Sequence, residues 1–232
     1  MGLLILKIKV KSYLMPQNIS PIELEKRCAI IEACLEMNRL GINQGTSGNI
    51  SVRHEDYLLI TPTSVPYKQL KPESIVRMET DGSVKGSLKP SSEWRFHLDI
   101  LNARPEVNAV VHAHPTYSTI ISIMGLNIPA IHYMIAVAGG DNIRCAPYET
   151  FGTEALSHQA LKALEGRKAC LLEHHGIIAV GANLSKALWL AVEVETLAKQ
   201  FHGALQLGKP RVLSHDQIDA IVEKISNYGH AD

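Results

Sequence analysis

The stretch Val107-Asn108-Ala109-Val110-Val111-His112-Ala113-His114-Pro115 decides the fold. Its apolar and β-branched residues predict a buried strand, and Pro115 ends that strand because proline has no backbone N–H to donate. Side chains two positions apart on a strand point to the same face, about 6–7 Å apart along the chain. His112 and His114 can therefore share one metal ion at bonds of about 2.1 Å. The alternative is a pair of histidines satisfied by backbone or water, and this dipeptide pattern alone leaves both interpretations open.

A second pair, His174-His175, supplies a candidate third ligand between the apolar runs Lys168–Glu173 and Gly176–Val180. Adjacent residues on a strand point in opposite directions, so only one member of this pair can join the first two histidines. Three neutral nitrogens leave an open coordination position, as a catalytic metal site requires. No cysteine stands at a spacing suited to a fourth ligand, which disfavours a closed structural site.

Glu93 is the best carboxylate candidate beside these histidines. It follows Ser91 and Ser92 at the expected start of a helix, where a lone glutamate is more often only a helix-dipole residue. The same helix N-terminus offers N–H groups and hydroxyls to an anion. Two further small polar turns, Gly45–Asn49 and Thr61–Ser64, can wrap a phosphate, although each alone is usually just a turn. Three such turns beside the histidines favour a phosphate site.

Composition argues against several classes of function. The 232 residues include 23 Lys and Arg against 23 Asp and Glu, without a basic stripe, so charge indicates neither nucleic acid nor an anionic membrane as a partner. The longest apolar runs, such as Leu188–Val192, are far too short to span a bilayer. The four cysteines (Cys28, Cys34, Cys145 and Cys170) form no CxxC motif, which favours reduced thiols in a cytoplasmic protein.

The rest of the pattern alternates short strands with helices. A capping box at Ser20–Glu23 begins a helix that ends near Gly41. Its expected core-facing stripe consists of Leu24, Cys28, Ile31 and Leu35. Strands are expected near residues 50–53, 57–61, 107–114, 131–137, 144–147, 168–173 and 176–180, and a hairpin is expected from 78 to 84. Further helices are expected at 91–104, at 153–164, at 184–207 and after 214. This order predicts an α/β single-domain layered fold with a largely antiparallel central sheet flanked by helices.

The domain is expected to cover residues 20–232, with residues 1–19 as an N-terminal extension. Met1–Leu14 carries a short apolar run followed by alternation, which suits an edge strand, a disordered segment, or an extension ahead of a start at Met15. The apolar run is too short for a secretory signal peptide.

Longer strings resemble the class II aldolase family, which includes several sugar-phosphate aldolases, a ribulose-5-phosphate 4-epimerase and the adducin head domain. The strings are Asn43–Thr46, Ile60–Thr63, Pro90–His97, Ile128–Ile135 and Lys186–Ala191. The similarity runs from about Glu25 to Tyr228 and implies the layered fold of that family. It is closest to the branch that cleaves L-fuculose 1-phosphate to dihydroxyacetone phosphate and L-lactaldehyde, so the resemblance implies this reaction.

The resemblance also implies a zinc ion, or another divalent cation, in each subunit. Its ligands would be His112, His114, His175 and Glu93, with His174 as a bystander. Glu93 matches the catalytic acid/base of the family, and a metal-assisted reaction needs no lysine Schiff base.

Further site residues are implied by position. Those that match the phosphate site are Thr46, Gly48, Asn49, Thr63, Ser64, Ser91 and Ser92. Tyr133 matches a catalytic tyrosine that reaches in from a neighbouring subunit, and Tyr228 matches a second tyrosine from that neighbour, which binds substrate. The implied partners are a small-molecule sugar phosphate and other copies of the chain, in a homotetramer with sites at subunit interfaces. Nucleic acid and membrane are not expected partners.

Departures from the family pattern keep other functions open. Ser64 stands where the nearest relatives tend to have glycine, and Ile225 replaces an aromatic that helps to close the aldehyde pocket, so another ketose 1-phosphate remains an alternative. A 4-epimerase should prefer aspartate at Glu93. An adducin-like binding module would have a dead site, which the complete ligand set disfavours. A zinc hydrolase is the weakest alternative, because the sequence contains no HExxH motif.

Overall fold

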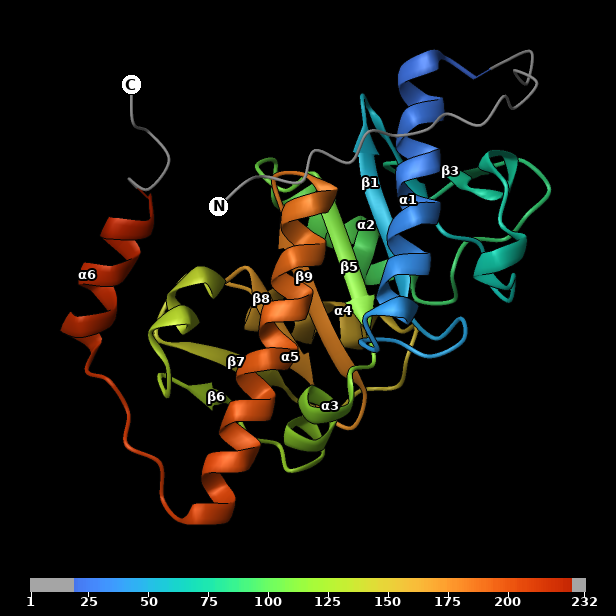
Figure 1. Cartoon of the computed structure of the whole chain (residues 1–232). Coiled ribbons are helices and arrows are strands. Elements are labelled where there is room, and N and C mark those ends of the chain that lie inside the picture. The colour runs from blue at the N-terminus through green and yellow to red at the C-terminus, as the bar shows by residue number, and fades with distance from the viewer. Residues whose placement is uncertain (1–18, 227–232) are drawn as a thin grey trace.

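The computed structural model describes residues 19–226, in which nine strands form one sheet between two layers of helices (Figure 1). The strand order is β4-β3-β2-β1-β5-β9-β8-β7-β6, and every neighbouring pair is antiparallel except β7 and β8. The strands are β1 (Asn49–His54), β2 (Tyr57–Ile60), β3 (Val76–Glu79), β4 (Val84–Lys85), β5 (Ala109–Ala113), β6 (Ile128–Pro129), β7 (Asn142–Ala146), β8 (Ala169–Leu172) and β9 (Gly176–Gly181). The predicted layered, largely antiparallel α/β fold is confirmed.

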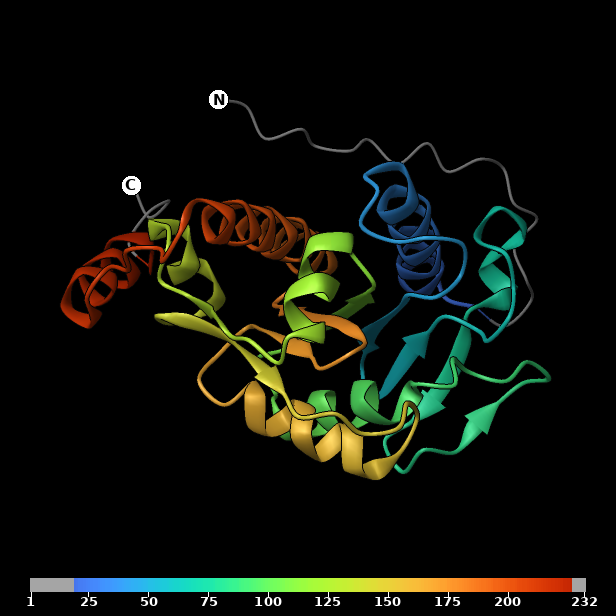
Figure 2. The same ribbon diagram turned by 90° about the horizontal axis from the view of Figure 1, so that it is seen from below.

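Helices cover both faces of this sheet. They are α1 (Pro21–Arg39), α2 (Trp94–Ala103), α3 (Thr116–Ile123), α4 (Glu154–Ala163), α5 (Leu184–Leu207) and α6 (His215–Ser226), with short 3-10 turns η1 (Tyr67–Gln69), η2 (Pro72–Ser74) and η3 (Tyr133–Ala138). Seen from below, α1, α3 and α5 lie on one face of the sheet and α2 and α4 on the other (Figure 2). The expected extension, its edge strand, Met15 and Tyr228 lie outside the described residues.

Strand β5 lies at the centre of the sheet, between β1 and β9, and all five of its residues are buried. Ala109 and Val111 pack into the core beneath α1 and α5, whereas Val110 packs into the core beneath α2 and α4. His112 is two residues beyond Val110 and so faces the α2 side, where its ring meets Phe96 at 5.3 Å between centroids. The alternation along β5 thus directs His112 towards the start of α2.

The buried face of α1 differs from the predicted stripe. Of the predicted stripe, Leu24 is buried and Ile31 packs partly buried against the core, but Leu35 is 39% exposed, and the helix also buries Ile30, Cys34 and Met37. Apolar residues occur on more than one face of this helix, so several stripes with helical spacing compete. Packing against β1 selects one of them, and sequence periodicity alone does not decide which.

The strand predicted over residues 131–137 is wrong. The chain instead forms η3, which begins after His132 and ends at Gly139. The Nδ1 atom of His132 accepts the N–H of Met134 at 3.2 Å, and Gly139 has a left-handed φ of 95°. These local contacts close a turn, and they outweigh the β-propensity of the apolar run.

Helix α3 was not predicted, because its cap comes from a distant part of the chain. Glu195 on α5 accepts the backbone N–H groups of Tyr117 and Ser118 at 2.9 and 2.8 Å, and it also accepts the Ser118 hydroxyl. A carboxylate at a helix N-terminus satisfies orphan N–H groups and complements the helix dipole. The sequence next to α3 carries no such signal.

The buried ion pair between Arg27 and Glu23 links α1 to the rest of the molecule by hydrogen bonds. Nε of Arg27 donates to Glu23 at 2.7 Å, and the Tyr57 hydroxyl donates to the second oxygen of Glu23 at 2.9 Å. Arg27 also donates to the carbonyl groups of Pro72, at 2.9 Å, and Ile75. Both charged groups are buried, so each depends on the other for its charge balance.

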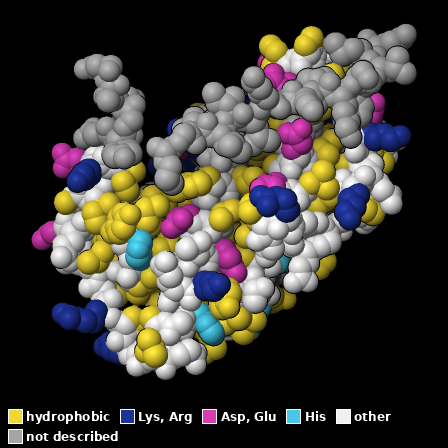
Figure 3. Space-filling model, in the orientation of Figure 1, with side chains coloured by type: hydrophobic (Ala, Val, Ile, Leu, Met, Phe, Trp, Pro, Cys, Tyr) yellow, Lys and Arg dark blue, Asp and Glu magenta, His cyan; other side chains and the backbone are white. Residues whose placement is uncertain are grey.

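Apolar helices, charged side chains and cysteines have the following features in the part of the chain that the structure describes. No helix between residues 19 and 226 is long and apolar enough to cross a membrane. Lys and Arg side chains are scattered over the face seen in Figure 3 and form no continuous patch there. All four cysteines carry free thiols, two of them buried.

Replacing Arg27 by methionine should lower the free energy of unfolding by about 3–5 kcal/mol, because Glu23 would keep a buried charge without its partner. Urea unfolding followed by circular dichroism measures this loss. The control is Arg39→Met, which breaks an exposed ion pair with Glu36 on the same helix and should leave the midpoint nearly unchanged. Equal midpoints for Arg27→Met and wild type would contradict this role of the buried pair.

Candidate metal centre and active site

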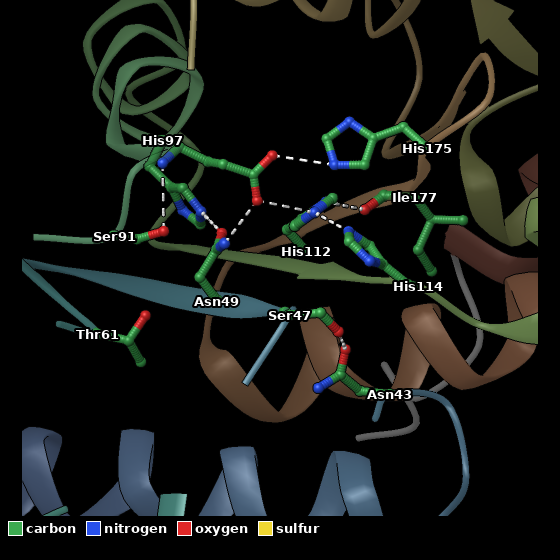
Figure 4. Close-up of polar contacts among 12 residues, drawn as sticks. Asn43, Ser47, Asn49, Thr61, Ser91, His97, His112, His114, His175 and Ile177 are labelled. Carbon is green, nitrogen blue, oxygen red and sulfur yellow. Dashed lines mark hydrogen bonds and ion pairs between the residues drawn. The ribbon is translucent and has the colours of Figure 1, made fainter. Parts of the chain in front are cut away.

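Four side chains from separate parts of the chain converge at the end of β5 (Figure 4). His112 lies on β5, His114 follows that strand, His175 lies between β8 and β9, and Glu93 is the N-cap of α2. One ligand atom from each of the four lies within 4.8 Å of the other three. The structure therefore brings together the four residues that the sequence analysis placed in one metal site.

The distances among these atoms suit a shared cation. Nε2 of His112 lies 2.8 Å from Nε2 of His114 and 3.1 Å from Oε2 of Glu93. Nδ1 of His112 lies 2.8 Å from the carbonyl oxygen of Ile177, so Nδ1 carries the proton and Nε2 keeps a lone pair. Oε1 of Glu93 is buried and accepts no hydrogen bond from a described residue, although Nε2 of His175 lies 3.0 Å away. The lone pairs on these nitrogen and oxygen atoms face one another and repel. A divalent cation between them would bind one ligand atom from each of the four side chains.

The protonation states also suit a metal. Burial raises the pKa of Glu93, whereas the charges and hydrogen bonds that His112 and His175 supply when their rings are protonated lower it well below its usual range. Burial lowers the pKa of His114 to about 3, with further contributions from His112 and His175. At neutral pH the site thus offers an ionised carboxylate and a neutral imidazole, which are the forms that bind a metal.

His174 and His175 lie in a tight turn and not on a strand, which corrects the alternation argument. The turn joins antiparallel neighbours β8 and β9, and His174 has a left-handed φ of 54°. The His174 ring packs edge-on to Tyr148 at 6.1 Å, whereas Nε2 of His175 lies 3.0 Å from Oε1 of Glu93. The two rings diverge because of this turn, and only His175 reaches the other ligands.

A pocket of about 480 Å³ opens beside the four ligands. Its lining includes small hydroxyl side chains from three turns, Thr46, Ser47, Thr63, Ser64 and Ser92. It also includes Tyr148, Glu149, Phe151 and His174. The loop from 148 to 151 was missed in the sequence, where its only signal is a pair of aromatic residues in a polar stretch after a strand. Those aromatics are 58% and 62% exposed in the single chain.

Three residues expected to bind phosphate lie beneath this pocket and do not line it. A Cβ on Gly48 would lie 2.6 Å from the carbonyl oxygen of His112, so glycine permits the close approach of its turn to β5. Nδ2 of Asn49 donates to Glu93 at 2.9 Å, and the Ser91 hydroxyl accepts the N–H of Glu93 at 3.3 Å. The pairing of β1 with β5 sets Asn49 opposite His112 and buries it. Asn49 and Ser91 thus contact Glu93, and a role of these three residues in phosphate binding stays a prediction.

The Class II Aldolase and Adducin N-terminal domain matches residues 28–202. The chain belongs to this family. Over 201 residues it is 54% identical to an L-fuculose phosphate aldolase of Escherichia coli, covering 86% of this chain and 94% of that protein. Over 203 residues it is 51% identical to a 5-methylthioribulose-1-phosphate/5-deoxyribulose-1-phosphate aldolase of Rhodospirillum rubrum, covering 88% and 92%. A solved L-fuculose 1-phosphate aldolase superposes with a TM-score of 0.86 at 36% identity, covering 91% of this chain and all of that one.

This protein is therefore a metal-dependent class II aldolase for a ketose 1-phosphate, with a site made of histidines and one glutamate. The family resemblance seen in the sequence is confirmed, and so is the aldolase reaction class. Tyr133 is 53% exposed and does not line the pocket of its own chain, and Ile225 lies on α6. The action of Tyr133 from a neighbouring subunit stays a prediction.

The histidine assignment predicts different outcomes for two adjacent substitutions. His175→Ala should lose stoichiometric metal, because its Nε2 faces the ligand cluster. His174→Ala should retain the metal, because its ring faces Tyr148. Metal content after dialysis, measured by plasma mass spectrometry, distinguishes the two variants. Retention in His175→Ala together with loss in His174→Ala would reverse the assignment.

Proposed function

We propose that this aldolase uses zinc and reversibly cleaves L-fuculose 1-phosphate to dihydroxyacetone phosphate and L-lactaldehyde. The observation that carries the proposal is the ligand cluster of three histidines and Glu93 beside a pocket lined with hydroxyl groups. Three imidazole nitrogens and one carboxylate suit zinc, which prefers nitrogen ligands to the all-oxygen sets of magnesium and calcium. The 54% identical relative supports the choice of ketose.

The acid/base role belongs to Glu93. A divalent cation at this site would supply a Lewis acid for the ketose oxygen. Glu93 is ionised at neutral pH, so it can take a proton from C3 of dihydroxyacetone phosphate and return it in the cleavage direction. Its fixed place at the N-cap of α2 keeps the carboxylate beside the ligand histidines.

The phosphate group would bind in the turns that line the pocket, with hydroxyl groups from Thr46, Thr63, Ser64 and Ser92. Ser92 precedes α2, where helix N–H groups favour an anion. Ser64 has a left-handed φ of 61°, a conformation that costs a serine more than a glycine. This supplies a physical reason for glycine in related phosphate loops.

Tyr133 and Tyr228 complete the proposed site from a neighbouring subunit, in a homotetramer that works in the cytoplasm. In the cleavage direction Tyr133 would help to remove the proton from the C4 hydroxyl. Its exposure, and its absence from the pocket lining of its own chain, support a role across a subunit boundary.

A second candidate substrate is 5-methylthioribulose 1-phosphate, favoured by Ile225 in place of an aromatic and by the 51% identical relative. Both ketoses would give dihydroxyacetone phosphate and differ only in the aldehyde. Purified enzyme should cleave L-fuculose 1-phosphate with at least about tenfold higher kcat/KM, the scale of one lost pocket contact. The opposite ranking would assign the enzyme to the methylthio sugar. Inactivity on both would contradict the ketose class.

Glu93→Gln should keep the fold and part of the metal affinity but lose about 10²–10⁴-fold in turnover, the usual contribution of a positioned proton-transfer group. Steady-state cleavage and metal content, measured on the same preparation, separate lost chemistry from lost metal. A rate within a few-fold of wild type would remove Glu93 from the proton transfer.

Ser92→Ala should weaken binding of a dihydroxyacetone-phosphate mimic by about 1–3 kcal/mol, the scale for a hydrogen bond to a charged group. Calorimetric binding of the mimic and of its unphosphorylated analogue makes the comparison. The matched control is Ser47→Ala, which also lines the pocket but whose hydroxyl already donates to Asn43 at 3.0 Å. If both ligands lose equal affinity in Ser92→Ala, Ser92 does not recognise phosphate.

A further inference from the structure

A chain of buried hydrogen bonds leads to Glu93 from the interior. Oγ of Ser51 lies 2.8 Å from Nδ1 of His97, and Nε2 of His97 lies 2.5 Å from Oδ1 of Asn49. Nδ2 of Asn49 then donates to Oε2 of Glu93 at 2.9 Å, as Figure 4 shows for the Asn49 end of the chain. Ser51 and His97 are fully buried, and neither they nor Asn49 line the pocket.

This series of hydrogen bonds forms a ladder, in which the side chains alternate between strand β1 and the start of helix α2. Asn49 and Ser51 are two residues apart on β1 and so share one face of the sheet. Glu93 and His97 are four residues apart at the start of α2 and so share one face of the helix. Two strand residues advance about 6–7 Å and four helix residues about 6 Å, so the two spacings match. The four side chains can therefore alternate between the strand and the helix without strain.

The donors and acceptors along the ladder point in one direction. An ionised Glu93 only accepts, so Asn49 must present its N–H₂ group to the carboxylate and its carbonyl oxygen to His97. That oxygen only accepts, so His97 must carry its proton on Nε2. Nδ1 of His97 is then an acceptor, which Ser51 satisfies with its hydroxyl. Each group donates to the next, and the last acceptor is Glu93.

Packing keeps the His97 ring in this state. The ring stacks on Phe96 at 4.8 Å with an interplanar angle of 27°. Burial lowers the pKa of His97 to about 3, so the ring is neutral at physiological pH. A neutral ring with one tautomer selected by Ser51 is a rigid donor to Asn49.

We propose that His97, with Ser51, is a positioning residue of the aldolase reaction, because it fixes the Asn49 amide with its N–H₂ group towards Glu93. This inference rests on the proposed acid/base role of Glu93. Without the His97 donor, the Asn49 amide can turn its oxygen towards the carboxylate, and repulsion between the carboxylate and the partial negative charge of that oxygen would then push Glu93 away from its position. A displacement of this kind lowers a rate even when the metal and substrate still bind.

The test is the exchange of the C3 hydrogen of dihydroxyacetone phosphate in deuterated water, followed by proton NMR. This half-reaction needs no aldehyde, so it reports on Glu93 whichever ketose is the natural substrate. His97→Phe removes both ring nitrogens at similar volume and should slow exchange about 10–100-fold, the usual scale for a residue that orients a ligand. His97→Gln places an amide N–H near the position of Nε2 and should restore the rate to within a few-fold of wild type.

Zinc affinity supplies a second measurement that does not depend on turnover. Competition with a chromophoric chelator should give weaker zinc binding in His97→Phe than in wild type or His97→Gln, because Glu93 belongs to the ligand cluster. A wild-type exchange rate and zinc affinity in His97→Phe would overturn the inference. Equal impairment in the Phe and Gln variants would also overturn it. Wild-type enzyme that does not exchange the hydrogen at all would instead contradict the proposed function.

Ser51→Ala keeps the inference testable if His97→Phe does not fold. It leaves the ring in place but removes the donor to Nδ1, so the other tautomer becomes accessible, and exchange should slow about tenfold. The matched control is Ser157→Ala, an equally buried serine that donates at 2.6 Å to Asp99 on α2. Ser157→Ala should keep the wild-type exchange rate. Equal exchange rates in Ser51→Ala, Ser157→Ala and wild type would overturn the inference.

Discussion

The pairing of β5 with β1 on one side and β9 on the other determines where every part of the active site lies. It sets Asn49 opposite His112 and brings the β8–β9 turn, with His175, to the same end of the sheet. All these strands are antiparallel, so their hydrogen bonds define a register, and a shift of one residue would turn His112 to the opposite face. The ligand cluster follows from this register.

The start of α2 supplies the remaining part of the site. Glu93 is buried there beside His112 and His175, and burying a carboxylate without partners is costly. Asn49 supplies one hydrogen bond, and a cation among the ligand atoms would supply the charge balance that the buried Oε1 atom otherwise lacks. Functional sites commonly hold polar groups that the protein core alone does not satisfy, and this cluster has that character.

The lining of the pocket and the contacts of Glu93 come from different parts of the structure. Hydroxyl groups from three turns line the pocket, whereas Asn49 and Ser91 hydrogen-bond to Glu93 and Gly48 lets its turn approach β5 closely. The ladder that ends at Glu93 ties a central strand to a helix, so the position of the carboxylate depends on the two most rigid kinds of element. The loop with Tyr148 and Phe151 is more exposed and can vary without disturbing the metal ligands.

The sequence by itself determined the fold class, the strand that carries His112 and is followed by His114, and the four candidate ligands. These depend on local periodicity, on turn chemistry and on strings long enough to show the family. Only the tertiary structure decided which face of α1 is buried, that residues 133–138 form a turn, and that Glu195 caps α3. It also decided that Asn49 serves Glu93 and that His97 stands behind it. Apart from the turn at 133–138, each of these depends on partners far away in the chain, and a local pattern carries no information about groups that only folding brings within hydrogen-bond distance.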